Sequence, residues 1–174
     1  MRALAASLSA IALATALTPG PVLAAFDGTN YDRLVGYLNE QGLTVEAGEP
    51  LSIDGTIVFP KGFRDAFEAF LGDGFEGNEV RVGQGGRLIF KLDNTGARDS
   101  IVARFDCRYP GFTYRWREGA DEKPYSQVVV LTRHPACIKR NESDAGELSW
   151  YVPKGRHKDI ARSLMLFREV FVQP

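Results

Sequence analysis

The most reactive side chains of this sequence are two cysteines and two histidines, at Cys107, His134, Cys137 and His157. Thiolate and imidazole groups in this number are the ligands of a Cys₂His₂ metal site, and His134 and Cys137 are close enough in sequence to share one ion. Cys107 has no second ligand near it. An oxidising compartment would instead join the two thiols, and the even cysteine count favours that outcome. The pattern therefore predicts a Cys107–Cys137 disulfide in preference to a metal site.

Paired carboxylates are a second candidate for chemistry, because two acidic side chains at a suitable separation hydrolyse glycosidic bonds. Two groups offer such a pair: Glu142 with Asp144, and Glu118 with Asp121 and Glu122. Both groups lie in segments rich in polar residues, where exposed charge is the usual finding. No G-x-S-x-G nucleophile motif is present. A small exported hydrolase that uses the Cys/His cluster or a carboxylate pair, with the two histidines as the residues to test, is therefore the alternative function.

A glycine-rich segment at 72–77 matches the G-x-G-x-x-G string of dinucleotide-binding proteins. That string needs a strand before it and a helix after it, whereas here a helical pattern precedes it and a strand pattern follows. Oxygen-bearing side chains gather in the same stretch at Asp73, Glu76, Asn78 and Glu79, but their spacing is not that of an EF-hand. We interpret the segment as a solvated acidic connection, and the sequence predicts no cofactor and no metal.

Basic side chains occupy the polar positions of several consecutive strand patterns. In the segment Phe112–Arg117, aromatic residues alternate with polar ones, and a strand places alternate side chains on opposite faces. If these strands are neighbours, six basic side chains share one solvent-exposed face. They are Arg81, Arg87, Lys91, Arg104, Arg115 and Arg117. Such a face favours anionic partners, because positive charges gathered on one surface attract negative charge over a distance.

The chain is nearly neutral overall, with 21 Lys and Arg against 22 Asp and Glu, but the charge is unevenly distributed. Residues 25–79 hold three basic and eleven acidic side chains, whereas residues 80–117 hold eight basic and three acidic ones. The asymmetry is typical either of an anion-binding face or of acidic and basic elements that lie side by side and neutralise each other.

The first 24 residues follow the pattern of a cleavable secretory signal. Arg2 precedes a short apolar run. Proline and glycine residues then interrupt any helix, and small residues lead up to Ala24. The run is shorter than the roughly 20 apolar residues that span a bilayer, and no later segment is apolar enough to be a transmembrane segment. We therefore expect a signal peptide at 1–24 and export, either by secretion or to a periplasm. Residues 25–174 have the length of a single domain.

Three segments carry the apolar spacing of amphipathic helices. They are residues 30–41, 63–71 and 157–171. Thr29 or Asn30 is expected to cap the first helix and Gly42 to end it. For the last segment, a strand over 164–172 is the alternative.

Apolar and polar residues alternate from Glu79 onward, as in strands with one buried face. The expected strands are 79–82, 87–92, 100–106, 112–117, 126–133 and 147–152, preceded by β-like pieces at 43–46 and 51–59. Turn residues between them favour an antiparallel β-meander of about five or six strands. The N-terminal helices and the C-terminal helix should pack on one face of this sheet, which gives an α+β fold.

These observations lead to one hypothesis: a secreted or periplasmic, non-catalytic binding or inhibitor-like protein. Its partner would be an anionic glycan, a lipid head group or a protein surface, since an exported protein does not meet intracellular nucleic acid. The hypothesis depends on the basic strand positions and on the lack of a complete catalytic motif in the sequence. Asn141 also fits the N-glycosylation pattern, which matters only for a eukaryotic source.

Overall fold

The computed structural model describes residues 25–46, 48–72, 78–94, 97–108, 111–120 and 124–172. The expected signal peptide, residues 1–24, lies outside the described residues. Within them, the chain folds into three helices and several antiparallel sheets, which confirms the expected α+β class.

Amphipathic spacing places the helices where their apolar residues predict them. They are α1 (Gly28–Glu40), α2 (Lys61–Gly72) and α3 (His157–Glu169). The cap of α1 differs from the expectation, because the N-cap is Asp27 rather than Thr29 or Asn30. Its Oδ1 accepts a 3.0 Å hydrogen bond from the Asn30 N–H, which satisfies one of the free donors of the first turn.

The longer strands divide between two sheets, so the single meander that we expected is wrong. The five-stranded sheet has the order β10 (Ser143–Asp144), β9 (Ile138–Arg140), β6 (Ala97–Arg104), β5 (Arg87–Asn94) and β4 (Glu79–Val82). The three-stranded sheet has the order β11 (Glu147–Pro153), β8 (Tyr125–Thr132) and β7 (Phe112–Arg117). Alternation of apolar and polar residues identifies the two faces of a strand, but it does not identify which strand pairs with it. Here β6 pairs with β9, which is distant from it in the sequence.

Two short strand pairs complete the described sheets. β2 (Leu51–Ile53) and β3 (Thr56–Val58) form a hairpin, and the turn residues Asp54 and Gly55 have φ values of 50° and 76°. After α3 the chain becomes extended in β12 (Phe171–Val172), which pairs with β1 (Ala25–Phe26). The C-terminal segment is therefore mostly helix, as expected, with a short strand at its end.

The segment 43–46 is a loop, so the β-like piece expected there is wrong. Val45 is buried in it, and its N–H donates a 2.8 Å hydrogen bond to the side-chain oxygen of Asn39. A side chain of α1 therefore takes the place of a partner strand.

Cys107 and Cys137 form the disulfide that the sequence predicts. The bond joins the segment after β6 to the short helix η1 (Pro135–Cys137), which leads directly into β9. β6 and β9 are also paired antiparallel, with Val102 opposite Lys139. The disulfide and the strand pairing therefore fix the same two parts of the chain.

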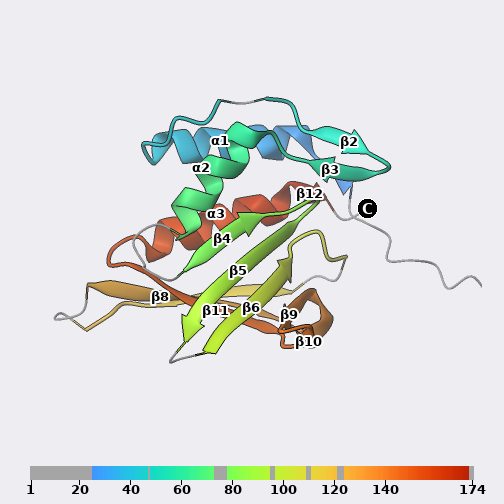
Figure 1. Cartoon of the computed structure of the whole chain (residues 1–174). Coiled ribbons are helices and arrows are strands. Elements are labelled where there is room, and N and C mark those ends of the chain that lie inside the picture. Colours follow the sequence, from blue (N-terminus) through green and yellow to red (C-terminus); the bar gives the residue numbers. More distant parts are fainter. Residues whose placement is uncertain are drawn as a thin grey trace, which may run out of the picture.

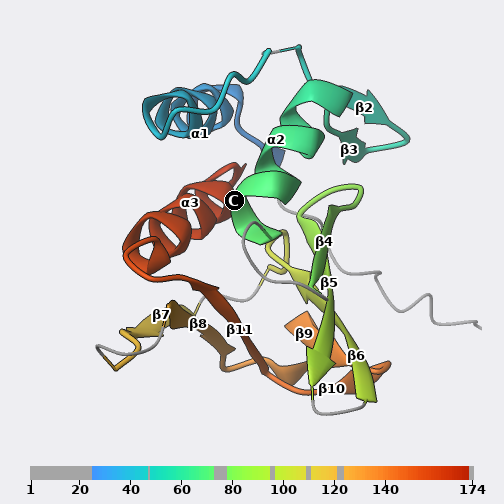
Figure 2. The same cartoon turned by 60° about the vertical axis from the view of Figure 1, so that its left-hand side comes forward.

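The core lies between the helices and the inner faces of the two larger sheets (Figure 1, Figure 2). α1 packs against α3, α3 lies on the three-stranded sheet, and α2 lies beside β4. Phe63 and Phe67 of α2 meet Phe59 and Phe167 in a cluster of aromatic rings at the centre. The inner faces of both sheets are therefore filled by the core, and their outer faces are exposed to solvent.

Candidate functional site

The six basic residues singled out in the sequence do not all lie together. Four of them project outward from the five-stranded sheet, and two lie on β7 of the three-stranded sheet. The first group is Arg81, Arg87, Lys91 and Arg104, and the second is Arg115 and Arg117. The single face with six basic residues, which required all these strands to be neighbours, is therefore wrong.

The first group surrounds an apolar pair at the middle of the five-stranded sheet. Ile89 of β5 lies directly opposite Val102 of β6. The register gives this pair six outward-facing neighbours, of which five are basic. They are Arg81, Arg87, Lys91, Arg104 and Lys139, with Ser100 as the sixth. We call these eight residues the outer face.

Part of the outer face is hollowed. An open depression of about 710 Å³ has Ile89 and Val102 in its lining, together with Arg87, Arg104 and Lys139. Asn141 and Glu142, in the turn between β9 and β10, also line it. The depression therefore combines an apolar surface with cationic side chains from three strands.

Glu79 neutralises one border of the outer face. It accepts a 2.8 Å hydrogen bond from Arg81, and it also lies 3.3 Å from Arg98 and 4.0 Å from Lys91. The hydrogen bond from Arg81, followed by the charge of Lys91, lowers the pKa of this carboxyl below its usual range. Glu79 therefore stays ionised and compensates part of the positive charge.

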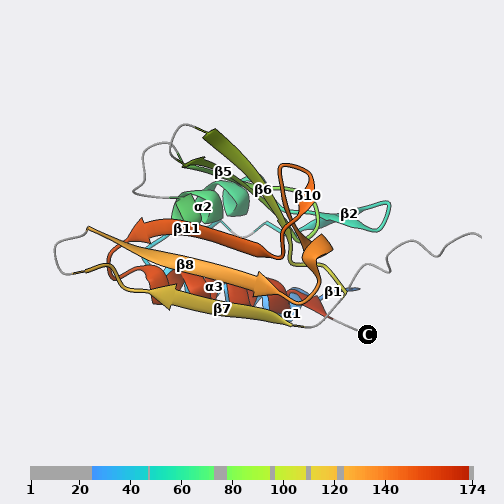
Figure 3. The ribbon, with the colours of Figure 1, turned by 90° about the horizontal axis from the view of Figure 1, so that it is seen from below.

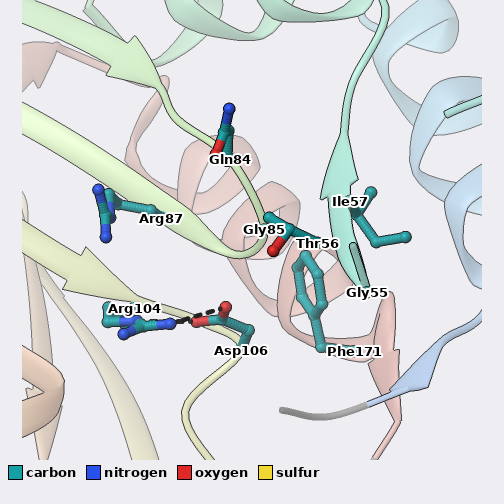
Figure 4. A pocket seen from close by; sticks show the side chains of 9 residues that line it. All are labelled: Gly55, Thr56, Ile57, Gln84, Gly85, Arg87, Arg104, Asp106 and Phe171. Atoms are coloured by element: carbon teal, nitrogen blue, oxygen red, sulfur yellow. Dashed lines mark hydrogen bonds and ion pairs between the residues drawn. The ribbon is translucent and has the colours of Figure 1, made fainter. Parts of the chain in front are cut away.

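Arg87 and Arg104 lie directly opposite each other on β5 and β6. Nε and Nη2 of Arg104 donate to the two carboxylate oxygens of Asp106, each over 3.3 Å, and Asp106 is only 6% exposed. Arg87 is exposed and has no ion pair within the part of the chain that the structure describes. Figure 4 shows this difference: Arg104 is aimed at Asp106, whereas Arg87 lies apart from it.

Arg87 and Arg104 also line a second, smaller cleft (Figure 4). Its volume is about 160 Å³, and the hairpin β2–β3, the turn between β4 and β5 and the C-terminal strand β12 contribute to its walls. Its lining includes Thr56, Gln84, Asp106 and Phe171 in addition to Arg87 and Arg104. The two arginines therefore border both cavities, and an anion in either one would meet Arg87.

The Cys/His metal site expected as an alternative is wrong, because both thiols are used in the disulfide. His134 is exposed next to η1, and His157 is 3% exposed at the start of α3. Across the described residues, no group of three or more histidine, cysteine and acidic side chains is arranged to hold a metal ion.

The carboxylate groups differ in their surroundings. Asp144 lies 3.8 Å from Lys139, and Glu142 lies in the adjacent turn with a φ of 70°. Glu118 is exposed after β7, whereas Asp121 and Glu122 lie outside the described residues. Most of the glycine-rich segment, residues 73–77, also lies outside them.

Lys139 and the apolar pair were missed in the sequence. Lys139 follows Cys137 by two residues, and Arg104 precedes Cys107 by three. The predicted disulfide already brings these two segments together, so it was the signal that places Lys139 beside the strand of Arg104. The alternation of Ile89 with Arg87 and Lys91 carried no comparable signal, because an apolar residue at an outward position is common.

Comparison with protein-family models, with curated proteins and with solved structures found no match. Among the described residues, no helix is long and apolar enough to cross a membrane.

Proposed function

We propose that this chain is an exported binding protein without catalytic activity, and that its outer face engages an anionic macromolecule. The observation that carries the proposal is Arg87, which lies directly opposite Arg104 in the register of β5 and β6 and has no ion pair among the described residues. Like charges at directly opposite positions of a sheet repel each other, and Asp106 compensates only one of the two. A carboxylate, sulfate or phosphate group of a partner supplies the second negative charge.

The other basic residues of the outer face support the same partner. Arg81 and Lys91 are paired with Glu79, and Lys139 is paired with Asp144, at the surface, where ion pairs contribute only about 0–1 kcal/mol each. An anionic partner can therefore replace them at little cost. Ile89 and Val102 add an apolar surface that a partner would remove from water. The open shape of the depression suits a polymer or a surface better than an enclosed small molecule.

Export is part of the proposal. It is supported by the signal-like pattern at 1–24 and by the Cys107–Cys137 disulfide, since disulfides persist mainly in oxidising compartments. In such a compartment the available polyanions are acidic glycans, lipid head groups and acidic protein surfaces.

Replacing Glu79 with glutamine is expected to strengthen polyanion binding severalfold. The substitution releases Arg81, Lys91 and Arg98 from their shared carboxylate and removes one negative charge from the border of the outer face. Affinity for heparin, for vesicles containing anionic phospholipid and for poly-glutamate can be measured by biolayer interferometry. The probe with the highest affinity identifies the class of partner.

Glu40→Gln is the matched control for this experiment, because it removes one exposed carboxylate from α1 rather than from the five-stranded sheet. It should leave the affinity almost unchanged. Equal effects of the two substitutions would mean that only the net charge matters, and no binding to any of the three probes would contradict the proposed function.

A further inference from the structure

One edge of the three-stranded sheet has no strand beside it among the described residues. β7 is the last strand of that sheet, and Figure 3 shows it along the border opposite β11, with α3 behind it. Within the described residues, β8 is the only segment whose backbone is hydrogen-bonded to β7. A strand in this position presents a row of backbone donors and acceptors that another strand can bind.

The register identifies which residues present these free groups. The Thr132 N–H donates a 2.9 Å hydrogen bond to the Gly146 carbonyl, so Thr132 directs its backbone groups away from β7. Backbone direction alternates along a strand, so Leu131, Val129 and Gln127 direct theirs toward β7. Their partners on β7 are Thr113, Arg115 and Arg117. The backbone groups of the intervening residues, Phe112, Tyr114 and Trp116, therefore point outward at the border.

The edge strand β4 of the five-stranded sheet, in contrast, is covered. At β4, the Val82 N–H donates a 2.9 Å hydrogen bond to the Glu68 carboxylate, and α2 packs beside the strand. A helix and an acidic side chain therefore occupy that border. β7 has no such cover from the described residues, although it is six residues long and contains no proline.

The side chains of β7 determine which kind of strand can pair with it. Arg115 and Arg117 project from one face of the strand, are exposed, and have no ion pair with any described residue. Antiparallel pairing of β7 with β7 of a second copy would bring four arginines onto one face, and like charges across a sheet are destabilising. A segment with acidic side chains at alternate positions would instead place a carboxylate beside each arginine.

From this arrangement we infer that β7 is a strand-addition site for an extended acidic peptide segment of a partner protein. The segment pairs antiparallel with β7, and its backbone bonds to Phe112, Tyr114 and Trp116. Its acidic residues lie opposite Arg115 and Arg117, at positions without mutual hydrogen bonds, where side chains on neighbouring strands are closest. This site is separate from the outer face and does not depend on the function proposed for it.

A synthetic peptide of alternating glutamate and threonine tests the inference on the full mature protein. We expect it to bind, and a peptide with lysine in place of glutamate to bind at least about tenfold more weakly. N-methylation of the threonine amides should abolish binding, because these amides face β7. N-methylation of the glutamate amides should leave binding largely intact, because these amides point away from β7. The two methylated peptides have the same charge and the same number of methyl groups, so only the position of the methyl groups differs.

The protein variant R115E/R117E should reverse this preference, so that the lysine peptide binds better than the glutamate peptide. Both side chains are exposed, so the fold should be retained, which circular dichroism can verify. If methylation of the threonine amides and methylation of the glutamate amides weakened binding equally, or if neither weakened it, strand addition would be overturned. An unchanged preference in R115E/R117E would overturn the assignment to β7. R87Q weakens any binding of the same acidic peptide to the outer face, but it should leave the difference between the two methylated peptides intact, which separates the two sites.

Discussion

Replacing Gly86 with alanine is expected to destabilise the protein by about 3 kcal/mol or more. A Cβ atom at this position would lie 2.2 Å from the Asp106 N and 2.9 Å from the carbonyl carbon of Phe105. These are backbone atoms, so no side chain can move aside. The Gly86 carbonyl also accepts a 2.7 Å hydrogen bond from the Phe105 N–H, which holds the two segments together.

The effect should extend to the candidate site, because the same contact positions Asp106 beside Arg104. Arg168 of α3 donates a further hydrogen bond to the Phe105 carbonyl, so the turn between β4 and β5, the end of β6 and α3 meet at one point. A shift of the Gly85–Gly86 turn would therefore disturb the smaller cleft, which Gly85, Asp106 and Arg87 line.

Gly36→Ala is the control for this prediction. Gly36 lies within α1, and a Cβ atom there would have no neighbour within 4 Å. Alanine in a helix interior is more stable than glycine by roughly 0.5–1 kcal/mol, so this variant should be stabilised. Urea unfolding of both variants measures the difference. If Gly86→Ala were as stable as the wild type, or more stable, the close contact at Gly86 would be contradicted.

Removing the disulfide is expected to have the second large effect. Cys107 and Cys137 are 30 residues apart, and closing a loop of this length stabilises a protein by about 3–4 kcal/mol in the chain-entropy model. Net stabilities are typically about 5–15 kcal/mol, so the variant C107A/C137A should unfold at a clearly lower urea concentration. Strand pairing between β6 and β9 remains in that variant, so we expect a weaker fold rather than a different one.

Treatment with a thiol reductant provides the control for the disulfide. It should weaken the wild-type protein to the level of C107A/C137A and leave that variant unchanged. A reductant effect of equal size in both proteins, or none in either, would show that the bond does not support the fold as described.

The sequence was sufficient for the helices and for the faces of the strands, because both follow from short periods in a single segment. Leu34 and Phe67 are buried as their spacing predicts, and Arg87 and Arg115 are exposed as alternation predicts. Which strands become neighbours depends on pairing between distant segments, which a period of two does not encode. The expected basic face was divided between two sheets for this reason.

The same limit applies to the candidate site. Arg81, Arg87, Lys91 and Arg104 lie on strands that are consecutive in the sequence, and they come together. Lys139 joins them through the pairing of β9 with β6, and Asp106 is buried beside Arg104 by a turn that only tertiary structure brings close. The local signals therefore located part of the site, and the contacts between distant segments completed it.

The central claim, that the outer face binds anions through Arg87, is tested most directly by one titration. Heparin binding of the wild-type protein, of Arg87→Gln and of the exposed α3 control Arg162→Gln is measured at low and at physiological salt. We expect the wild type and Arg162→Gln to bind alike and to weaken as salt rises, because salt screens exposed charges over about 8 Å. Arg87→Gln should bind at least about tenfold more weakly at low salt. Equal affinity of all three proteins, or affinity independent of salt, would contradict the claim.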